Sequence, residues 1–390
     1  MKALTLFFSL LAAGQLFADP PKPWWPESVE TALSHAGDNR AELTKALTSV
    51  PEPQREGMKF LIENMPLQDL RGLKADYLLK NTALAYETFT AAPWAKQVPQ
   101  GIFLNDVLPY ASLNEVRDDW RQRVHDIAAP IVKDCKTPGE AAQALNKKLF
   151  GIVKVRYSTE RKKPDQSALE SMESGLATCS GLSILLVDAC RAAGIPARVA
   201  GTPMWSNLRG NHTWVEVWDG DWHFAGAAEP DSKGLDRGWF CGDAAKAQRD
   251  VPKHAIYASS FKKTALSFPL VWDLSIQWVP AVNVTDRYVP ATAAPAPEGK
   301  VRLLVRVLDR TGGKRVAAKV TLSDPADASL KLDGTSRDES ADLNNILPFT
   351  VARGREFKLT IEAGGKPVER SVKTTAGKGD EQTVTVTIAD

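Results

Sequence analysis

The sequence is constrained most by a cysteine at the start of a long apolar segment. Thr178 precedes Cys179, and residues 182–193 follow as a largely apolar run that Gly194-Ile195-Pro196 closes. Threonine is a favoured N-cap, and glycine followed by proline is a common helix stop, so the sequence predicts a helix that begins at Cys179. The backbone N–H groups and the dipole at the start of a helix favour a thiolate.

A histidine follows in a position that suits a nucleophilic pair. Residues 197–202 are predicted to form a buried strand, and His212 enters an alternating strand that continues to Trp218. Asp219-Gly220-Asp221 is a good hairpin turn, which leads into a further strand. A cysteine at a helix start with a histidine on a following strand is the layout that a Cys–His nucleophile needs.

The same segment resembles the transglutaminase-like superfamily, whose fold is related to that of papain-type cysteine proteases. The resemblance rests on the small-residue loop before Cys179, on residues 191–198 and on His212-x-Trp214-x-Glu216, and it covers roughly residues 140–240. It implies an α+β core in which the helix carrying the cysteine packs on an antiparallel sheet. It also implies a thioacyl intermediate on Cys179, with His212 as general base and acid, and a protein or peptide substrate. It does not choose between water and an amine as the acceptor, although many bacterial members look hydrolytic.

The third member of this catalytic group is not fixed by the sequence. Relatives usually carry an aspartate four residues beyond the tryptophan that matches Trp222, and this chain has Gly226 there. Glu229 is the nearest carboxylate and is the predicted third residue, with Asp231 as second choice. A backbone carbonyl or amide could orient the imidazole instead, and Glu216, on the same strand face as the histidine, is a structural alternative.

Two further residues are candidates for contact with a substrate. Gln166 lies in the polar loop of residues 158–174 and could stabilise an oxyanion together with the backbone N–H of Cys179. A plain loop glutamine is the alternative. Trp205 lies in the loop ahead of His212 and could face a substrate, with core packing as the alternative.

The chain divides into parts by composition. One basic residue, a short apolar run and a small residue before Asp19 are typical of a signal peptide that is cleaved near Ala18, which predicts an exported protein, periplasmic or secreted. Helical stripes precede the core, and a Pro/Ala linker separates it from a strand-rich tail. The predicted parts are a signal peptide (1–18), a helical region (19–125), the transglutaminase-like core (126–285), the linker (286–300) and a β-sandwich accessory domain (301–390).

Composition narrows the classes of partner. The 49 basic and 47 acidic residues give a net charge of +2, which does not suggest a nucleic-acid surface. No apolar run after the signal peptide is long enough for a transmembrane segment, and no cluster has zinc or calcium spacing. We therefore predict no cofactor and no metal. One disulfide among Cys135, Cys190 and Cys241 remains open, as does the alternative that all three are buried thiols.

Two other classes of function remain possible from the sequence. The first is a non-catalytic binding protein that keeps the fold, which Gly226 favours and the Cys179–His212 pair opposes. The second is a structural protein of the cell envelope that works mainly through residues 301–390. The sequence also leaves open whether the N-terminal helices cover the cleft as a propeptide would.

Overall fold

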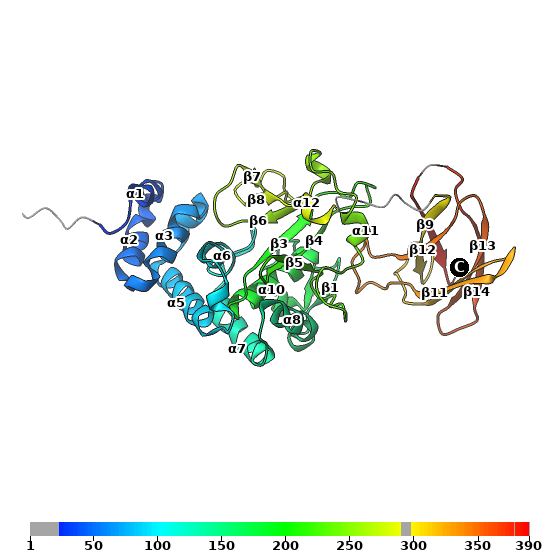
Figure 1. The fold of residues 1–390 in the computed structure, drawn as a ribbon, viewed down its shortest axis with the longest axis horizontal. Coiled ribbons are helices and arrows are strands. Elements are labelled where there is room, and N and C mark those ends of the chain that lie inside the picture. Colours follow the sequence, from blue (N-terminus) through cyan, green and yellow to red (C-terminus); the bar gives the residue numbers. More distant parts are fainter. Residues whose placement is uncertain (1–22, 290–297, 378, 390) are drawn as a thin grey trace, which may run out of the picture.

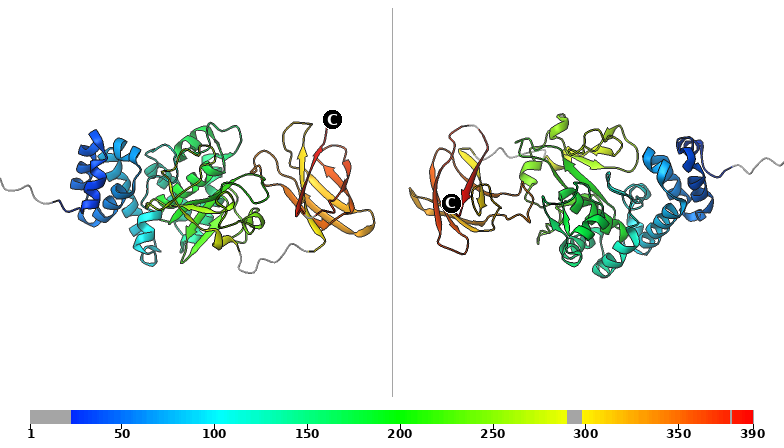
Figure 2. Two further views of the ribbon diagram at one scale, coloured as in Figure 1. Left: turned by 90° about the horizontal axis from the view of Figure 1, so that it is seen from above. Right: turned by 180° about the vertical axis from the view of Figure 1, so that it is seen from behind.

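The computed structural model describes residues 23–289, 298–377 and 379–389. The predicted signal peptide and most of the predicted linker lie outside these residues. The fold is α+β, as predicted, and has three parts in a row. A group of helices lies at one end, a mixed helix and sheet core lies in the middle, and a β-sandwich lies at the other end (Figures 1 and 2).

The N-terminal part is a bundle of short helices, as the apolar stripes predicted. Its buried residues form one cluster, which includes Leu43, Leu47, Met58 and Leu61. Most of the stabilisation of such short helices comes from burying an apolar face against neighbours. The helices are α1 (Glu27–Ser34), α2 (Arg40–Ser49), α3 (Arg55–Asn64), α4 (Leu67–Gly72), α5 (Ala75–Ala91) and α6 (Gln100–Asp106).

The core contains a six-stranded sheet with the order β5-β4-β3-β6-β8-β7, in which every neighbouring pair is antiparallel. Its strands are β3 (Ala197–Thr202), β4 (His212–Trp218), β5 (Trp222–Ala225), β6 (Tyr257–Ser259), β7 (Leu266–Ser267) and β8 (Pro280–Asn283). The helices around the sheet are α7 (Arg121–Val132), α8 (Pro138–Val153), α9 (Ala168–Ser174), α10 (Cys179–Ala192), α11 (Cys241–Ala244) and α12 (Thr285–Tyr288). A short parallel pair, β1 (Arg156–Tyr157) and β2 (Leu176–Ala177), leads the chain into α10.

Helix α10 begins and ends where the sequence predicts. The Thr178 side chain accepts a hydrogen bond from the backbone N–H of Gly181 at 3.1 Å, which caps the first turn. Gly194 follows the helix with a φ of +72°, and a Cβ at this position would lie 2.9 Å from the Cα of Phe89. Glycine is therefore required here both by the left-handed backbone and by the close approach of α5.

The N-terminal helices attach at the C-terminal end of α10. The Trp94 indole donates a hydrogen bond to the carbonyl oxygen of Gly194 at 2.8 Å. The buried Arg121 guanidinium donates to the carbonyl oxygen of Arg191 at 3.1 Å and to the side chain of Asn81 at 2.8 Å. These contacts hold the helices at the end of α10 opposite to Cys179.

The C-terminal part is a sandwich of two sheets. One sheet has the order β11-β10-β13-β14 and the other β12-β9-β15. The prediction of a purely antiparallel sandwich is wrong in one place, because β15 runs parallel to β9. The strands are β9 (Lys300–Leu308), β10 (Lys319–Asp324), β11 (Asp327–Thr335), β12 (Leu347–Ala352), β13 (Glu356–Glu362), β14 (Val368–Lys373) and β15 (Glu381–Thr387).

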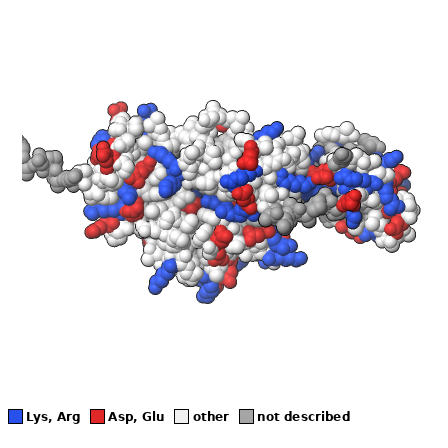
Figure 3. All heavy atoms as spheres, turned by 45° about the horizontal axis from the view of Figure 1, so that its top comes forward, with Lys and Arg blue, Asp and Glu red and all other residues white. Residues whose placement is uncertain are grey.

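Two general features concern the described residues only. None of their helices is long and apolar enough to cross a membrane. The four cysteines all lie within the described chain and are free thiols, so the open question of a disulfide is answered for this structure. Basic and acidic side chains are interspersed over the face drawn in Figure 3.

Candidate active site

The site is built where the start of α10 meets the start of β4. Ser180, directly after Cys179, shares a hydrogen bond of 3.0 Å with the hydroxyl of Thr213, directly after His212. This link fixes the two predicted catalytic residues side by side at the ends of their elements. The Thr178 hydroxyl also donates to the carbonyl oxygen of Pro164 at 2.6 Å, which holds the loop before the helix in place.

The strand that carries His212 is held by hydrogen bonds among buried charged and aromatic side chains. Glu216 is fully buried and accepts hydrogen bonds from Arg198 at 2.7 Å and from the Tyr288 hydroxyl at 2.8 Å. The Tyr288 hydroxyl in turn accepts from the Trp214 indole at 2.8 Å. The imidazole of His212 packs on the Trp239 ring, with 4.7 Å between ring centroids. These contacts fix the strand and the plane of the imidazole.

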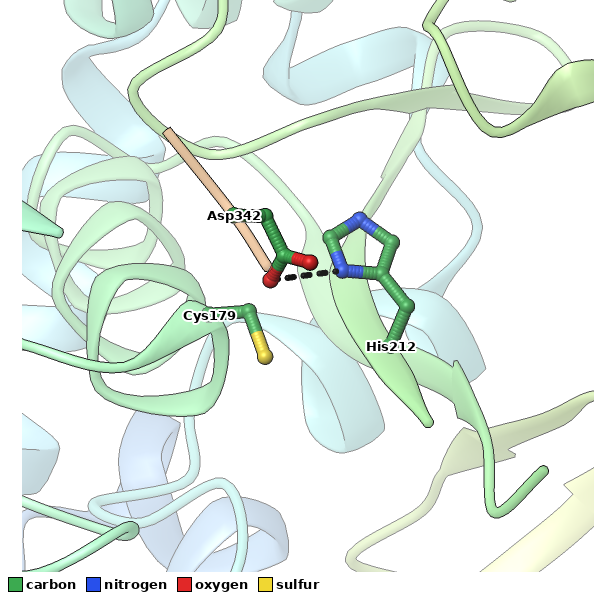
Figure 4. Close-up of side chains that lie close together, drawn as sticks. All are labelled: Cys179, His212 and Asp342. Atoms are coloured by element: carbon green, nitrogen blue, oxygen red, sulfur yellow. Dashed lines mark ion pairs between the residues drawn. The ribbon is translucent and has the colours of Figure 1, made fainter. Parts of the chain in front are cut away.

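A carboxylate from the sandwich reaches this site. Asp342, in the loop between β11 and β12, places Oδ2 at 3.4 Å from Nδ1 of His212 (Figure 4). Both side chains are almost fully buried. The ligand-type atoms of Cys179, His212 and Asp342 all lie within 4.8 Å of one another. Two domains therefore contribute to one cluster.

The cluster is triangular and is not a linear relay. In Figure 4 the thiol of Cys179 and the carboxylate of Asp342 lie on the same side of the imidazole, the side of Nδ1. The second ring nitrogen of His212, Nε2, points away from both. Neither Nδ1 nor Nε2 has a hydrogen-bond partner among the described residues, so the contact of Nδ1 with Asp342 is an ion pair only. In a Cys–His–carboxylate relay the ring lies between the thiol and the carboxylate, with each on its own nitrogen.

Charge in the cluster favours the imidazolium. Burial of the ring opposes protonation, but the Asp342 carboxylate and the Cys179 side chain outweigh it and raise the pKa of His212 to about 10. Burial likewise opposes ionisation of Asp342, yet the His212 charge and a hydrogen bond from the Asn344 backbone lower the pKa of this carboxyl. The raised pKa of His212 and the lowered pKa of Asp342 both describe a cationic imidazole beside an anionic carboxylate.

Glu229, the predicted third residue, is bound to Trp239, whose ring packs on His212. Its carboxylate accepts hydrogen bonds from the Trp239 indole at 2.8 and 3.0 Å, and among the described residues no hydrogen bond joins it to His212. Burial raises the pKa of Glu229 to about 7, although the His212 charge opposes this rise. A Cβ at Gly226 would lie 2.5 Å from Oε2 of Glu229, so this carboxylate takes the space of the missing side chain.

A cleft of about 190 Å³ opens beside Cys179. Core residues Tyr157, Arg161 and Trp272 line one part of it, and Leu343 and Asn344 of the sandwich line another. Among the described residues that line it, none belongs to the N-terminal helices. The sandwich therefore forms part of the wall of this cleft, and the described N-terminal helices do not.

Comparison with known proteins identifies the part that holds this site. Residues 125–243 match the profile of the transglutaminase-like superfamily, and they include Cys179, His212 and Glu229. This chain contains a transglutaminase-like domain. The predicted resemblance is thereby confirmed for these residues. No curated protein matches the chain significantly.

Two solved structures are similar to parts of the chain. One is a candidate cysteine protease from Cytophaga hutchinsonii, with 21% identity over 36% of this chain and a TM-score of 0.25. The other is the transglutaminase of red sea bream, with 10% identity over 73% of this chain and a TM-score of 0.32. The matched regions cover 48% and 66% of the lengths of those two proteins.

Neither of the two candidate substrate contacts is among the described residues that line the cleft. The side-chain amide of Gln166 donates to the carbonyl oxygen of Leu176 and to the Ser174 hydroxyl, both at 3.0 Å, and the residue is buried. This geometry gives no support to an oxyanion role. Trp205 is 1% exposed and stacks on Trp214, so the alternative of core packing describes it.

Sulfur, imidazole nitrogen and carboxylate oxygen are also the ligand types of zinc. Cys179, His212 and Asp342 are therefore the residues of the described chain that could hold a metal ion. The sequence did not predict this group, because Asp342 lies in a domain for which no catalytic constellation was expected. No signal in the spacing of the chain points to it, since only the docking of the sandwich brings it to His212.

Proposed function

We propose that this protein is a thiol-dependent enzyme that cleaves amide bonds through a thioacyl intermediate on Cys179. The observation that carries the proposal is the position of Cys179 at the start of α10, in a cleft and within 4.8 Å of an imidazole nitrogen of His212. The membership of residues 125–243 in the transglutaminase-like superfamily supports the same reaction class.

The proposed reaction has two halves. The Cys179 thiolate attacks the amide carbonyl carbon, and a carbon–sulfur bond forms as the carbonyl π electrons move to oxygen. The first backbone N–H groups of α10 have no partner within the helix and are suited to stabilise this oxyanion. The tetrahedral intermediate then collapses, the carbon–nitrogen bond breaks, and the His212 imidazolium gives its proton to the leaving amine.

The second half returns the thiol. Neutral His212 takes a proton from water or from an amine, which attacks the thioester carbon, and the carbon–sulfur bond breaks to regenerate the thiolate and the imidazolium. Water gives a carboxylic acid and makes the enzyme a peptidase or amidase. An amine gives a new amide and makes it a cross-linking acyltransferase. We favour water, as for the bacterial members that the sequence resembles.

We further propose that the substrate is a protein or peptide, including peptides of the cell envelope, and that the enzyme acts after export. The apolar N-terminal segment supports export, and the resemblance to the transglutaminase-like superfamily supports the substrate class. We propose Glu229 as the third member of the catalytic group. It would orient His212 through the Trp239 ring, which it binds and on which the imidazole packs.

The test is the pH dependence of Cys179 alkylation by iodoacetamide, read by peptide mass spectrometry. We expect the rate to persist well below the value of about 8.5 at which a free thiol ionises, and to collapse in His212→Ala. Cys190 is an internal reference in the same sample, because burial raises the pKa of its thiol to about 12. If Cys179 instead reacts like an ordinary thiol in the wild type, the acyl-transfer proposal fails and a non-catalytic binding protein, favoured by Gly226, takes its place.

The acceptor is tested separately. A glutaminyl peptide is incubated with the full chain, with and without a fluorescent primary amine, and the products are separated by mass. Conversion to the acid in both samples supports hydrolysis. Accumulation of the amine adduct overturns our preference for water and identifies cross-linking.

A further inference from the structure

The loop that joins β11 to β12, residues 336–346, is bound directly to the segment that carries His212. The side-chain amide of Asn344 donates to the carbonyl oxygen of Asn211 at 2.9 Å. The guanidinium of Arg209 donates to the carbonyl oxygen of Asn344, also at 2.9 Å. The sandwich therefore holds the residue immediately before His212, and its loop forms part of the wall of the cleft.

The carboxylate of Asp342 is held in place within the sandwich. The buried Arg315 donates to the carbonyl oxygens of Asp342 at 3.0 Å and of Ala341 at 2.5 Å. The backbone N–H of Asn344 donates to Oδ1 of Asp342 at 2.8 Å. These bonds hold the Asp342 carboxylate from within its own domain and leave Oδ2 directed at His212.

A second set of contacts fastens the sandwich to the core, and we call it the docking network: Arg209, Asp243, Arg302 and Glu381. Glu381 of β15 accepts from Arg302 at 2.7 Å and lies 3.2 Å from Nε of Arg209. Asp243 of α11 pairs with Arg209, and with Arg302 at 3.4 Å. Charged pairs of this kind weaken with rising salt, to a smaller degree when they are buried.

The side of the ring that Asp342 occupies excludes an orienting role for it. An orienting carboxylate binds the nitrogen that faces away from the nucleophile, and it leaves the nitrogen near the nucleophile available for proton transfer. Here the carboxylate lies on the side of Nδ1 that also faces Cys179, and it forms an ion pair with Nδ1 at 3.4 Å. Neither ring nitrogen has a hydrogen-bond partner among the described residues, so no group orients the ring from Nε2. An ionised carboxylate in that place adds negative charge beside a thiolate and takes the space of an acyl group, but it is too poor an electrophile to react.

We propose that the β-sandwich is a gate on the cleft, and that in the docked arrangement Asp342 occupies the reacting edge of His212 so that a substrate enters only after residues 336–346 are displaced. The proposal rests on the proposed function of Cys179 and His212, and it adds the regulation of that site. A second contact of the same loop fits this proposal. Asp342 and Leu343 line the cleft beside the thiol, and Arg337 and Asn345 line another hollow together with Glu229 and Trp239.

The test measures the rate of Cys179 alkylation by iodoacetamide in the full chain, with a chelator present so that a bound metal cannot mimic the gate. Two variants open the gate by different routes. Asp342→Asn keeps the acceptor for the Asn344 N–H and removes the charge, and Glu381→Ala weakens the docking network without touching the cleft. Asp327→Ala removes an exposed carboxylate at the start of β11 and is the matched control.

We expect both variants to react about tenfold faster than the wild type and the control, because each raises the population with an accessible thiol. Rising salt should accelerate the wild type and have little effect on Glu381→Ala. A slower reaction of Asp342→Asn would overturn the gate and make Asp342 a positioning residue. Unchanged rates in both variants would overturn it as well.

The His212→Ala variant separates the failure of the gate from the failure of the proposed function. If alkylation of the wild type depends on His212 but neither variant accelerates it, the gate proposal is wrong and the proposed enzymatic function stands. If alkylation is independent of His212 in every background, including Asp342→Asn, the proposed function is wrong, and the gate that rests on it falls too.

Discussion

The carboxylate of Glu229 fills the space that a side chain on Gly226 would take, because a Cβ at Gly226 would lie 2.5 Å from Oε2 and 3.2 Å from Cβ of Glu229. A carboxylate from three residues later thus lies against the position at which the resemblance predicts an aspartate. This relationship makes the two positions mutually exclusive, and it leads to the first two predictions.

Gly226→Ala should displace Glu229. The added Cβ has to push a side chain that also accepts from the Trp239 indole, so we expect a loss of stability of about 1–3 kcal/mol together with slower alkylation of Cys179. Gly72→Ala is the control, because nothing lies within 4 Å of a Cβ there. Thermal unfolding and the alkylation rate check the prediction, and equal behaviour of the two variants would contradict it.

Glu229→Gln should remove an acid limb from the pH profile of the enzyme. Burial raises the pKa of Glu229 to about 7, so its carboxylate becomes charged as the pH rises through that value. If this charge orients His212, amidase activity rises around pH 7 in the wild type and is lower in the variant by at least about tenfold above it. A variant that keeps the limb near pH 7 would show that another group produces it.

Asp342→Asn should lose stability relative to the wild type in a specific pH window. The pKa of His212 is raised from 6.5 to about 10 in the folded state, so the stability from its charge is fully present below pH 6.5 and is lost as the pH rises through 10. We expect the wild type to exceed the variant by about 3 kcal/mol near pH 6. The difference should shrink toward pH 10 in chemical unfolding experiments. A difference that stays constant would mean that the pair is not ionic.

The stabilisation by the ion pair of His212 and Asp342 should also be lost in acid. The pKa of Asp342 is lowered in the folded state, so the stability from this carboxylate is present above its usual value of 3.8 and is lost as the pH falls through the lowered one. The difference between wild type and Asp342→Asn should therefore also vanish in strong acid.

Glu216→Ala should be strongly destabilising. It would leave the guanidinium of Arg198 buried without its partner, and removal of one member of a buried pair costs about 3–5 kcal/mol. Glu369→Ala breaks an exposed pair with Lys358 and should cost less than about 1 kcal/mol. Calorimetric unfolding of the two variants provides the comparison. Similar melting temperatures would contradict a structural role for Glu216.

Much of the active site follows from the sequence because its determinants are local. A threonine cap, an apolar run and a glycine stop define α10, and they place Cys179 at its first residue. A hairpin turn and an alternating pattern define β4 and β5, and they place His212 at a strand start. Each of these signals involves residues that are neighbours in the sequence, so capping preferences and turn propensities apply to it directly.

The roles of Trp205 and Gln166 could not be read in this way. Both precede a catalytic residue in a polar loop, and the sequence offered a functional and a structural alternative for each. Packing decided between them: Trp205 stacks on Trp214, and the Gln166 amide donates to the backbone at Leu176. Such contacts depend on which segments meet in the core, and periodicity does not encode that.

The sequence by itself predicted the proposed catalytic pair, Cys179 and His212, and the order of helical, mixed and strand-rich parts along the chain. What only the tertiary structure decided is that the sandwich lies over the cleft and brings Asp342 to His212. The physical reason is that domain docking depends on the complementarity of two finished surfaces. The pairs of Arg209 with Glu381 and of Arg302 with Asp243 join residues of different domains, so no local sequence pattern predicts them.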